Sequence, residues 1–260
     1  MDNIIRQQSR PVQNVQTQSK TSQWLLLNSL LWAGLGFILV GLLSIGYSAL
    51  IKSLMSQATL NSDTYMISSI LVLFAFMILS FFINMKWASN VTQASWGLVV
   101  FVWLVDVILL TGMIAPLVTL IDDPQLVFIV IAASGGIFAL VGALGYCFMN
   151  TKLAMSLVKM VWFIIIGLFL FQLIFMLTFA FVYTNSFSWF YLLFDICYLI
   201  VSIAMVALTF FSISKSGEIY RDVANKQEKT KLGLYFGLQL LISFVIMFTY
   251  LLRIIARLKG

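Results

Sequence analysis

The chain has 260 residues, of which 62% are hydrophobic and only 9% are charged, and its formal net charge is +6. A soluble domain is about 45–50% apolar and about 25% charged, and a water-soluble fold of this size could not hide so much apolar surface. The composition therefore excludes a soluble globular protein and predicts an integral membrane protein.

The residue types present also exclude several kinds of chemistry. The chain contains no histidine, which rules out a Ser–His protease, a His-ligated metal site and a haem with a histidine ligand. Its two cysteines, Cys147 and Cys197, lie in apolar runs, where cysteine usually acts as a small hydrophobe and not as half of a disulfide. We therefore expect a protein that is not an enzyme, takes no cofactor and binds no nucleic acid. Metal binding is left open.

Apolar stretches dominate the chain after a polar start. A helix that crosses roughly 30 Å of hydrocarbon needs about 20 apolar residues. Seven stretches are long enough, at 24–51, 64–86, 95–120, 126–150, 157–184, 189–213 and 232–256. The sequence thus predicts an all-α integral membrane protein with seven transmembrane helices over residues 24–256, preceded by a disordered polar cytoplasmic tail at 1–23 and followed by a short tail at 257–260.

The breaks between spans and the distribution of charges leave alternatives for the number of spans and for their orientation. The breaks at 122–125 and 183–186 divide neighbouring spans, and misreading one of them would give six spans. With seven spans, the N-terminal tail and the loops after the second, fourth and sixth spans share one side, which receives most of the 15 Lys and Arg residues. Because cytoplasmic loops carry such an excess, we predict a cell-membrane protein with a cytoplasmic N-terminus. The basic C-terminus favours instead a six-span arrangement with both ends inside. The loop 214–231 is expected to be a solvated connection.

Two acidic residues lie inside predicted spans, where an ionisable group is costly and is a functional candidate. Asp106 is about ten residues into the third span, near the midplane, and Asp195 is about six residues into the sixth span, in its outer third. They are candidates for a polar path, as cation ligands or proton acceptors. The alternative is that each pairs with a polar side chain of a neighbouring helix, such as Gln172 or Gln239, and fixes the packing.

Other residues predict contacts at the membrane boundary and between helices. Lys86 ends the second span, where a lysine usually extends toward the lipid headgroups. Small residues in the fourth span recur at intervals of three and four, which predicts a face for close helix packing. They are Ala132, Gly135, Gly136, Ala139, Gly142 and Ala143.

Several apolar runs, taken in their order, are similar to those of a known family. They are LLWAGLGFILVGLLSIG at 30–46, VFVWLVDVILLTGMIAP at 100–116, FIVIAASGGIFALVGALGYCFMNTKLAMS at 128–156 and SFVIMFTYLLRIIA at 243–256. In this order the chain resembles the Bax-inhibitor-one (transmembrane Bax-inhibitor-motif) family over residues 24–256. The resemblance implies a bundle of helices around the C-terminal one, in a membrane protein without enzymatic chemistry.

The resemblance also implies a function and a modified gate. Bacterial members of the family are regarded as pH-sensitive calcium leak pathways, with one aspartate on the sixth span and one on the seventh that share a proton. At the matching positions, in LTFFSISKS and LLISFVIMF, this chain has Ser212 and Ser243. Two serines can bond across the same gap, but they do not titrate near neutral pH. Ser212 and Ser243 are therefore gate candidates, together with Lys86, which stands near a basic residue of the family's second span.

Two hypotheses follow. In the first, the chain is a calcium or cation leak whose path includes Asp106 and Asp195, with the serines as the gate. In the second, it is a non-conducting regulator that binds other membrane proteins, in stress tolerance or in control of a membrane protease, and the acids serve packing. The substitution Asp106→Asn separates them, because it changes conductance in the first and mainly stability in the second. A retinal photoreceptor is excluded, because the segment 232–250 holds no lysine for a Schiff base.

Overall fold

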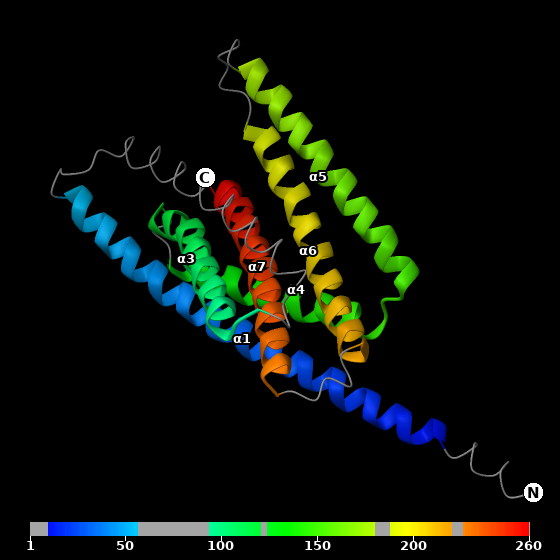
Figure 1. Cartoon of the computed structure of the whole chain (residues 1–260). Helices are drawn as coiled ribbons and strands as arrows, with labels where there is room; N and C mark the ends of the chain where they lie inside the picture. Colours follow the sequence, from blue (N-terminus) through cyan, green and yellow to red (C-terminus); the bar gives the residue numbers. More distant parts are fainter. Residues whose placement is uncertain (1–9, 57–93, 121–123, 180–187, 220–225, 260) are drawn as a thin grey trace, which may run out of the picture.

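The computed structural model describes residues 10–56, 94–120, 124–179, 188–219 and 226–259 (Figure 1). All regular structure in this part of the chain is α-helical. The helices are α1 (Arg10–Ser56), α3 (Trp96–Leu120), α4 (Pro124–Cys147), α5 (Thr151–Phe179), α6 (Ser188–Ile219) and α7 (Lys226–Lys259). Each of the six contains a segment that is long and apolar enough to cross a membrane. The chain is therefore an all-α, multi-pass membrane protein.

Six of the seven predicted spans coincide with a described helix. The remaining one, at 64–86, lies outside the described residues, and so does Lys86. The two weak breaks do divide helices, because α3 and α4 are separate, as are α5 and α6. Pro124 is the first residue of α4, a position where proline costs little because the N–H groups of the first turn have no partner within the helix.

Four helices, α1, α5, α6 and α7, extend well beyond one of their predicted limits. The polar tail was expected to be disordered up to residue 23, but α1 begins at Arg10. Glutamine, lysine and arginine are good helix formers, and extending an existing helix avoids the cost of nucleation. The same reason explains why α6 continues to Ile219, where Lys215 pairs with Glu218 at 2.9 Å, so that much of the expected loop 214–231 is helical.

Polar residues cap the first turns of two helices. The backbone N–H of Leu98 donates to Ser95 Oγ at 3.3 Å, and that of Leu153 donates to Asn150 Oδ1 at 2.8 Å. Each bond satisfies one of the N–H groups that a helix start leaves without a partner. These caps fix where α3 and α5 begin.

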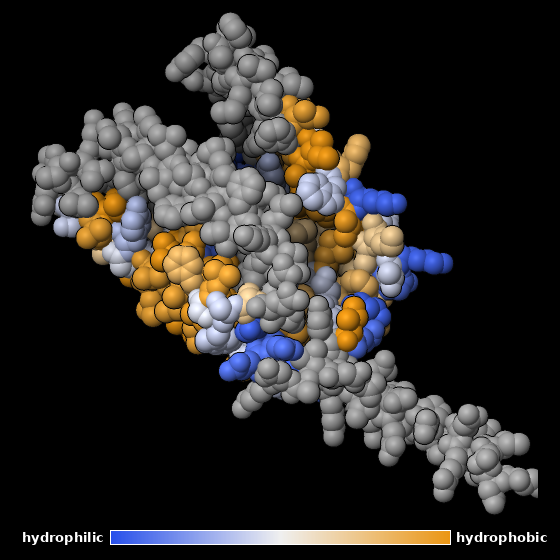
Figure 2. Space-filling model, viewed as in Figure 1, coloured by the Kyte–Doolittle hydropathy of each residue, from blue (hydrophilic) through white to orange (hydrophobic). Residues whose placement is uncertain are grey.

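Helix α7 packs against α1, α3, α4 and α6, while α5 packs on the outer side of α6 (Figure 1). The most deeply buried side chains of α7 are large and aliphatic, among them Leu234, Leu238, Leu241 and Leu252. The outer surface is hydrophobic over much of its visible area (Figure 2), and on α5 Phe163 is 81% exposed. An apolar exterior of this extent fits contact with lipid.

Close contact between α7 and α1 depends on two glycines in the sequence GLYFG. A Cβ at Gly233 would overlap the side chain of Asn28, and one at Gly237 would come within 2.8 Å of the Ser29 carbonyl oxygen. Glycines four residues apart lie on one helix face and let two backbones approach closely. This pair was not among the predicted packing residues, although the GxxxG spacing is a signal for such contact.

The small-residue face predicted for α4 is only partly a packing face. A Cβ at Gly135 or Gly136 would meet open space, whereas one at Gly142 would come within 2.6 Å of the Phe210 ring. One turn further on, a Cβ at Gly145 would overlap the backbone of Ala207 on α6. The predicted alanines at 132, 139 and 143 are exposed. Of the predicted glycines, only Gly142 meets α6. A face of small residues can also face lipid.

Candidate functional site

Asp195 on α6 is 2% exposed and forms ion pairs with two arginines of α7. Arg253 Nη2 lies 3.2 Å from Asp195 Oδ1, and Arg257 Nε lies 3.5 Å from Oδ2. The arginines are four residues apart and therefore project from one face of α7. A carboxylate at this depth needs such partners, since a buried charge without them is strongly destabilising.

Two tyrosines extend this contact along the same helices. Tyr198 and Tyr250 stack with ring centroids 5.0 Å apart and planes at 8°. The guanidinium carbon of Arg253 lies 5.7 Å from the centroid of the Tyr250 ring, within the range of a cation–π interaction. Together, Asp195, Tyr198, Tyr250, Arg253 and Arg257 form what we call the arginine cluster.

The arginine cluster favours the packing interpretation of Asp195. Its partners are two arginines, and not Gln172 or Gln239, which were the amides considered from the sequence. Gln239 lines a cavity elsewhere, and the side chain of Gln172 lies outside the described residues. Because two positive charges already face this carboxylate, it is a poor ligand for a further cation. A signal for these ion pairs is present in the sequence, because Arg253 and Arg257 stand four residues apart near the end of the last predicted span.

Asp106 lies in the core on α3 and is 3% exposed. Its neighbours along the helix, Trp103, Val107 and Leu110, belong to the main hydrophobic cluster. Asp106 is itself engaged with a partner, and it lines neither of the two cavities described below. Its position therefore fits a polar contact inside the helix packing.

A cavity of about 280 Å³ lies between α5, α6 and α7 and is partly polar. Its polar side chains are Thr209, Ser212, Tyr235 and Gln239. The Thr209 and Ser212 hydroxyls each donate, at 2.8 Å, to the backbone carbonyl one turn earlier in α6. With both hydrogens committed to the backbone, these oxygens have only lone pairs left to offer. We call this space the polar cavity.

The two gate candidates lie at different levels of the α6–α7 contact. Ser212 is exposed and lines the polar cavity, whereas Ser243 is 5% exposed and donates to a carbonyl of its own helix at 2.8 Å. Because Tyr198 faces Tyr250 across antiparallel helices, Ser212 lies opposite the level of Phe236. Ser243 is about two turns, or ~10 Å, further along α7. The structure does not bring the two serines together.

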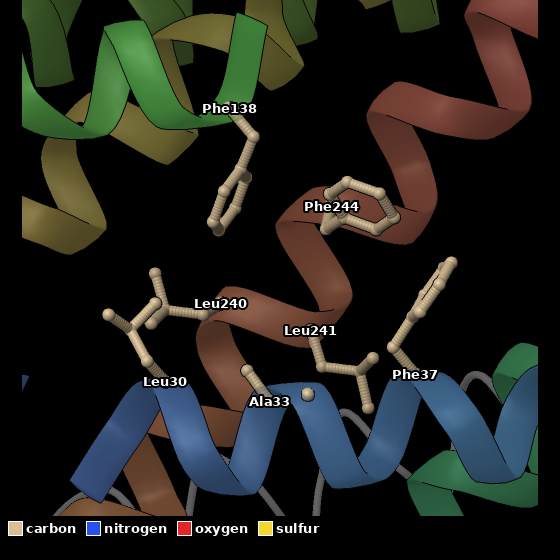
Figure 3. A pocket seen from close by; sticks show the side chains of 8 residues that line it. Leu30, Ala33, Phe37, Phe138, Leu240, Leu241 and Phe244 are labelled. Atoms are coloured by element: carbon tan, nitrogen blue, oxygen red, sulfur yellow. The ribbon is translucent and has the colours of Figure 1, made fainter. Parts of the chain in front are cut away.

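A second cavity, of about 200 Å³, opens between α1, α4 and α7 (Figure 3). Its walls are apolar, and three phenylalanines surround it. The ring of Phe244 meets that of Phe37 edge to face at 4.9 Å and that of Phe138 at 5.4 Å. This apolar groove offers no side-chain ligand to an ion and suits only apolar groups.

Metal ligands do not gather anywhere in the part of the chain that the structure describes. No group of three or more Cys, Asp or Glu side chains capable of holding a metal ion is present among these residues. Cys147 and Cys197 are both free thiols. Compared with known proteins, the chain matches no family model and no curated protein.

Proposed function

We propose that the chain is a seven-helix membrane protein of the Bax-inhibitor-one type, arranged around α7, that works as a cation leak through the polar cavity. The family resemblance supports the class and a cell-membrane location, and the Lys/Arg distribution supports a cytoplasmic N-terminus. The observation that carries the leak is the polar cavity itself, which Ser212 lines together with three further polar side chains between three apolar helices.

The chemistry of the polar cavity suits a cation in transit. Neutral oxygen ligands replace part of the hydration shell of an ion without holding it tightly, as backbone carbonyls do in selective channels. Thr209 and Ser212 contribute such oxygens, since their hydrogens are donated to the helix backbone. Asp195 is not required as a ligand, because Arg253 and Arg257 already compensate its charge.

The gate of this leak differs from that of the family. The aspartate pair that titrates in other members is replaced by Ser212 and Ser243, which have no ionisable group near neutral pH. The flux is therefore expected to stay level between about pH 8 and pH 6, the interval in which a coupled carboxylate pair can titrate. A steep rise at low pH would contradict a leak that lacks a titrating pair.

The test is ion flux into liposomes that carry the purified full chain. Calcium and potassium entry are measured with two dyes, beside empty liposomes. Thr209→Val keeps the side-chain shape but removes the oxygen, and we expect it to reduce the flux about fivefold, as for the loss of one polar interaction of about 1 kcal/mol. Thr111→Val is the matched control, because Thr111 makes the same 2.8 Å back-bond but lies on α3, away from the polar cavity. Equal flux in liposomes with and without protein would refute the leak.

The second candidate is a non-conducting regulator that binds other membrane proteins. It is favoured by the ion pairs that hold Asp195 within the helix packing and by the burial of Asp106 among apolar residues of α3. The same liposomes separate the candidates. Flux no greater than in empty liposomes, for the unmodified protein as well as for Thr209→Val, would support the regulator.

A further inference from the structure

The charges of the arginine cluster are separated by depth. The carboxylate of Asp195 is 2% exposed, whereas the side chains of Arg253 and Arg257 are 36% and 30% exposed. The acidic group thus lies inside the helix packing, whereas the two arginine side chains are partly exposed, although Nη1 of Arg257 is itself buried. These three side chains together carry one net positive charge. The surface that the cluster presents is therefore cationic, although its interior is an ion pair.

The arginine cluster lies at the end of the membrane span of α7. The apolar segment of α7 ends at Ile255, so Arg253 lies within one turn of that end and Arg257 lies just beyond it. This level corresponds to the boundary between hydrocarbon and water, where lipid phosphates lie. The stacked pair of Tyr198 and Tyr250 is also typical of that level, since tyrosine prefers the interface.

We propose that Arg253 and Arg257 form a binding site for the phosphate of an anionic phospholipid. A guanidinium is a planar fork of five N–H donors that matches two phosphate oxygens, so a contact with Asp195 leaves donors of Arg253 for a second acceptor. The buried Asp195 carboxylate orients both arginines, and the guanidinium of Arg253 also lies over the Tyr250 ring. Basic sites between transmembrane helices bind anionic headgroups in this way. The site is separate from the polar cavity and does not depend on the leak.

A lipid site and a purely structural ion pair predict different effects of one substitution on lipid binding. Asp195→Asn removes the competing carboxylate and leaves both arginines, so lipid binding should become tighter. If the cluster only locks α6 to α7, this variant loosens the arginines and brings no gain in lipid. Arg253→Gln should weaken lipid binding in either background.

The experiment is native mass spectrometry of the full chain, released from detergent after incubation with phosphatidylglycerol or phosphatidylcholine. We expect retained phosphatidylglycerol to fall about tenfold in Arg253→Gln, the loss of one charge-assisted contact of about 1.4 kcal/mol, and to rise in Asp195→Asn. Lys215→Gln is the control, because Lys215 is already paired with Glu218 at the opposite end of α6. Circular dichroism checks that each variant keeps its helices. If Arg253→Gln loses its helical structure, the change in lipid retention of Asp195→Asn decides between the two interpretations.

Each outcome bears on the proposal. Preference for phosphatidylglycerol over phosphatidylcholine, with opposite effects of the two variants, supports the site. Equal retention of both lipids, or an unchanged Asp195→Asn, overturns it. Displacement of phosphatidylglycerol by millimolar inorganic phosphate, without selective lipid retention, would mean a site for free phosphate and also overturns the lipid assignment.

Discussion

Tyr198 and Tyr250 stack with their ring centroids 5.0 Å apart, and one turn away on each helix Asp195 meets Arg253 at 3.2 Å. These two contacts fix the register of α6 against α7 at one end of the antiparallel pair. The register in turn determines which side chains meet further along. At the other end of the contact, the hydroxyls of Thr209 and Ser212 line the polar cavity. The same register keeps Ser212 and Ser243, the predicted gate residues, at different levels.

The ion pair of Asp195 and Arg253 should stabilise the fold measurably. We expect Asp195→Ala to lower the free energy of unfolding by about 1–3 kcal/mol, less than for a fully buried pair because the arginine is partly exposed. A double-mutant cycle with Arg253→Ala, measured by reversible unfolding in mixed micelles, should be non-additive. The exposed pair Lys215–Glu218 is the control, and its coupling should stay below about 0.5 kcal/mol. Additive losses at Asp195 and Arg253 would contradict the pairing.

Contact between α4 and α6 should be sensitive to one methyl group at Gly145. A Cβ there meets the backbone of Ala207, which cannot turn aside as a side chain can, so Gly145→Ala should cost about 1–3 kcal/mol. Gly136→Ala has open space, and it should be neutral or stabilising by up to about 1 kcal/mol, because alanine favours the helix. Thermal unfolding in detergent measures both. Equal melting temperatures would show that the two helices are less close than described.

Asp106 should affect stability and not flux. It is buried on α3, which packs against α1 and α7, and the polar cavity lies between α5, α6 and α7. We therefore expect Asp106→Asn to lower the melting temperature while the flux per folded protein in liposomes stays the same. A flux that falls with an unchanged melting temperature would place Asp106 in the ion path instead.

The helices could be predicted from the sequence, but their contacts could not. Apolar runs of membrane length identify spans directly, since hydrocarbon requires an internally bonded backbone. The limits of α1 and α6 were missed because helix formation continues in water beyond the apolar run, as at Arg10 and Ile219. The partner of Asp195 was missed because it depends on the register of α6 and α7, which is set by tertiary packing.

The glycines show the same limit. Spacing indicates that Gly135 and Gly142 lie near one face of α4, but only the structure shows that Gly142 meets α6 while Gly135 meets open space. Conversely, Gly233 and Gly237 have the spacing of a contact face and do form one with α1. Whether a small residue faces a helix or lipid depends on the neighbours, and these are far away in the sequence.

The most direct test of the proposed leak is to block the polar cavity during flux. In a background with Cys147→Ser and Cys197→Ser, the variant Ser212→Cys places a thiol in the cavity, and Ile200→Cys places one on the exposed apolar face of α6. A water-soluble, positively charged thiol reagent should stop cation flux in Ser212→Cys and leave Ile200→Cys unchanged. Flux in Ser212→Cys that persists after confirmed labelling of the thiol would contradict a path through this cavity.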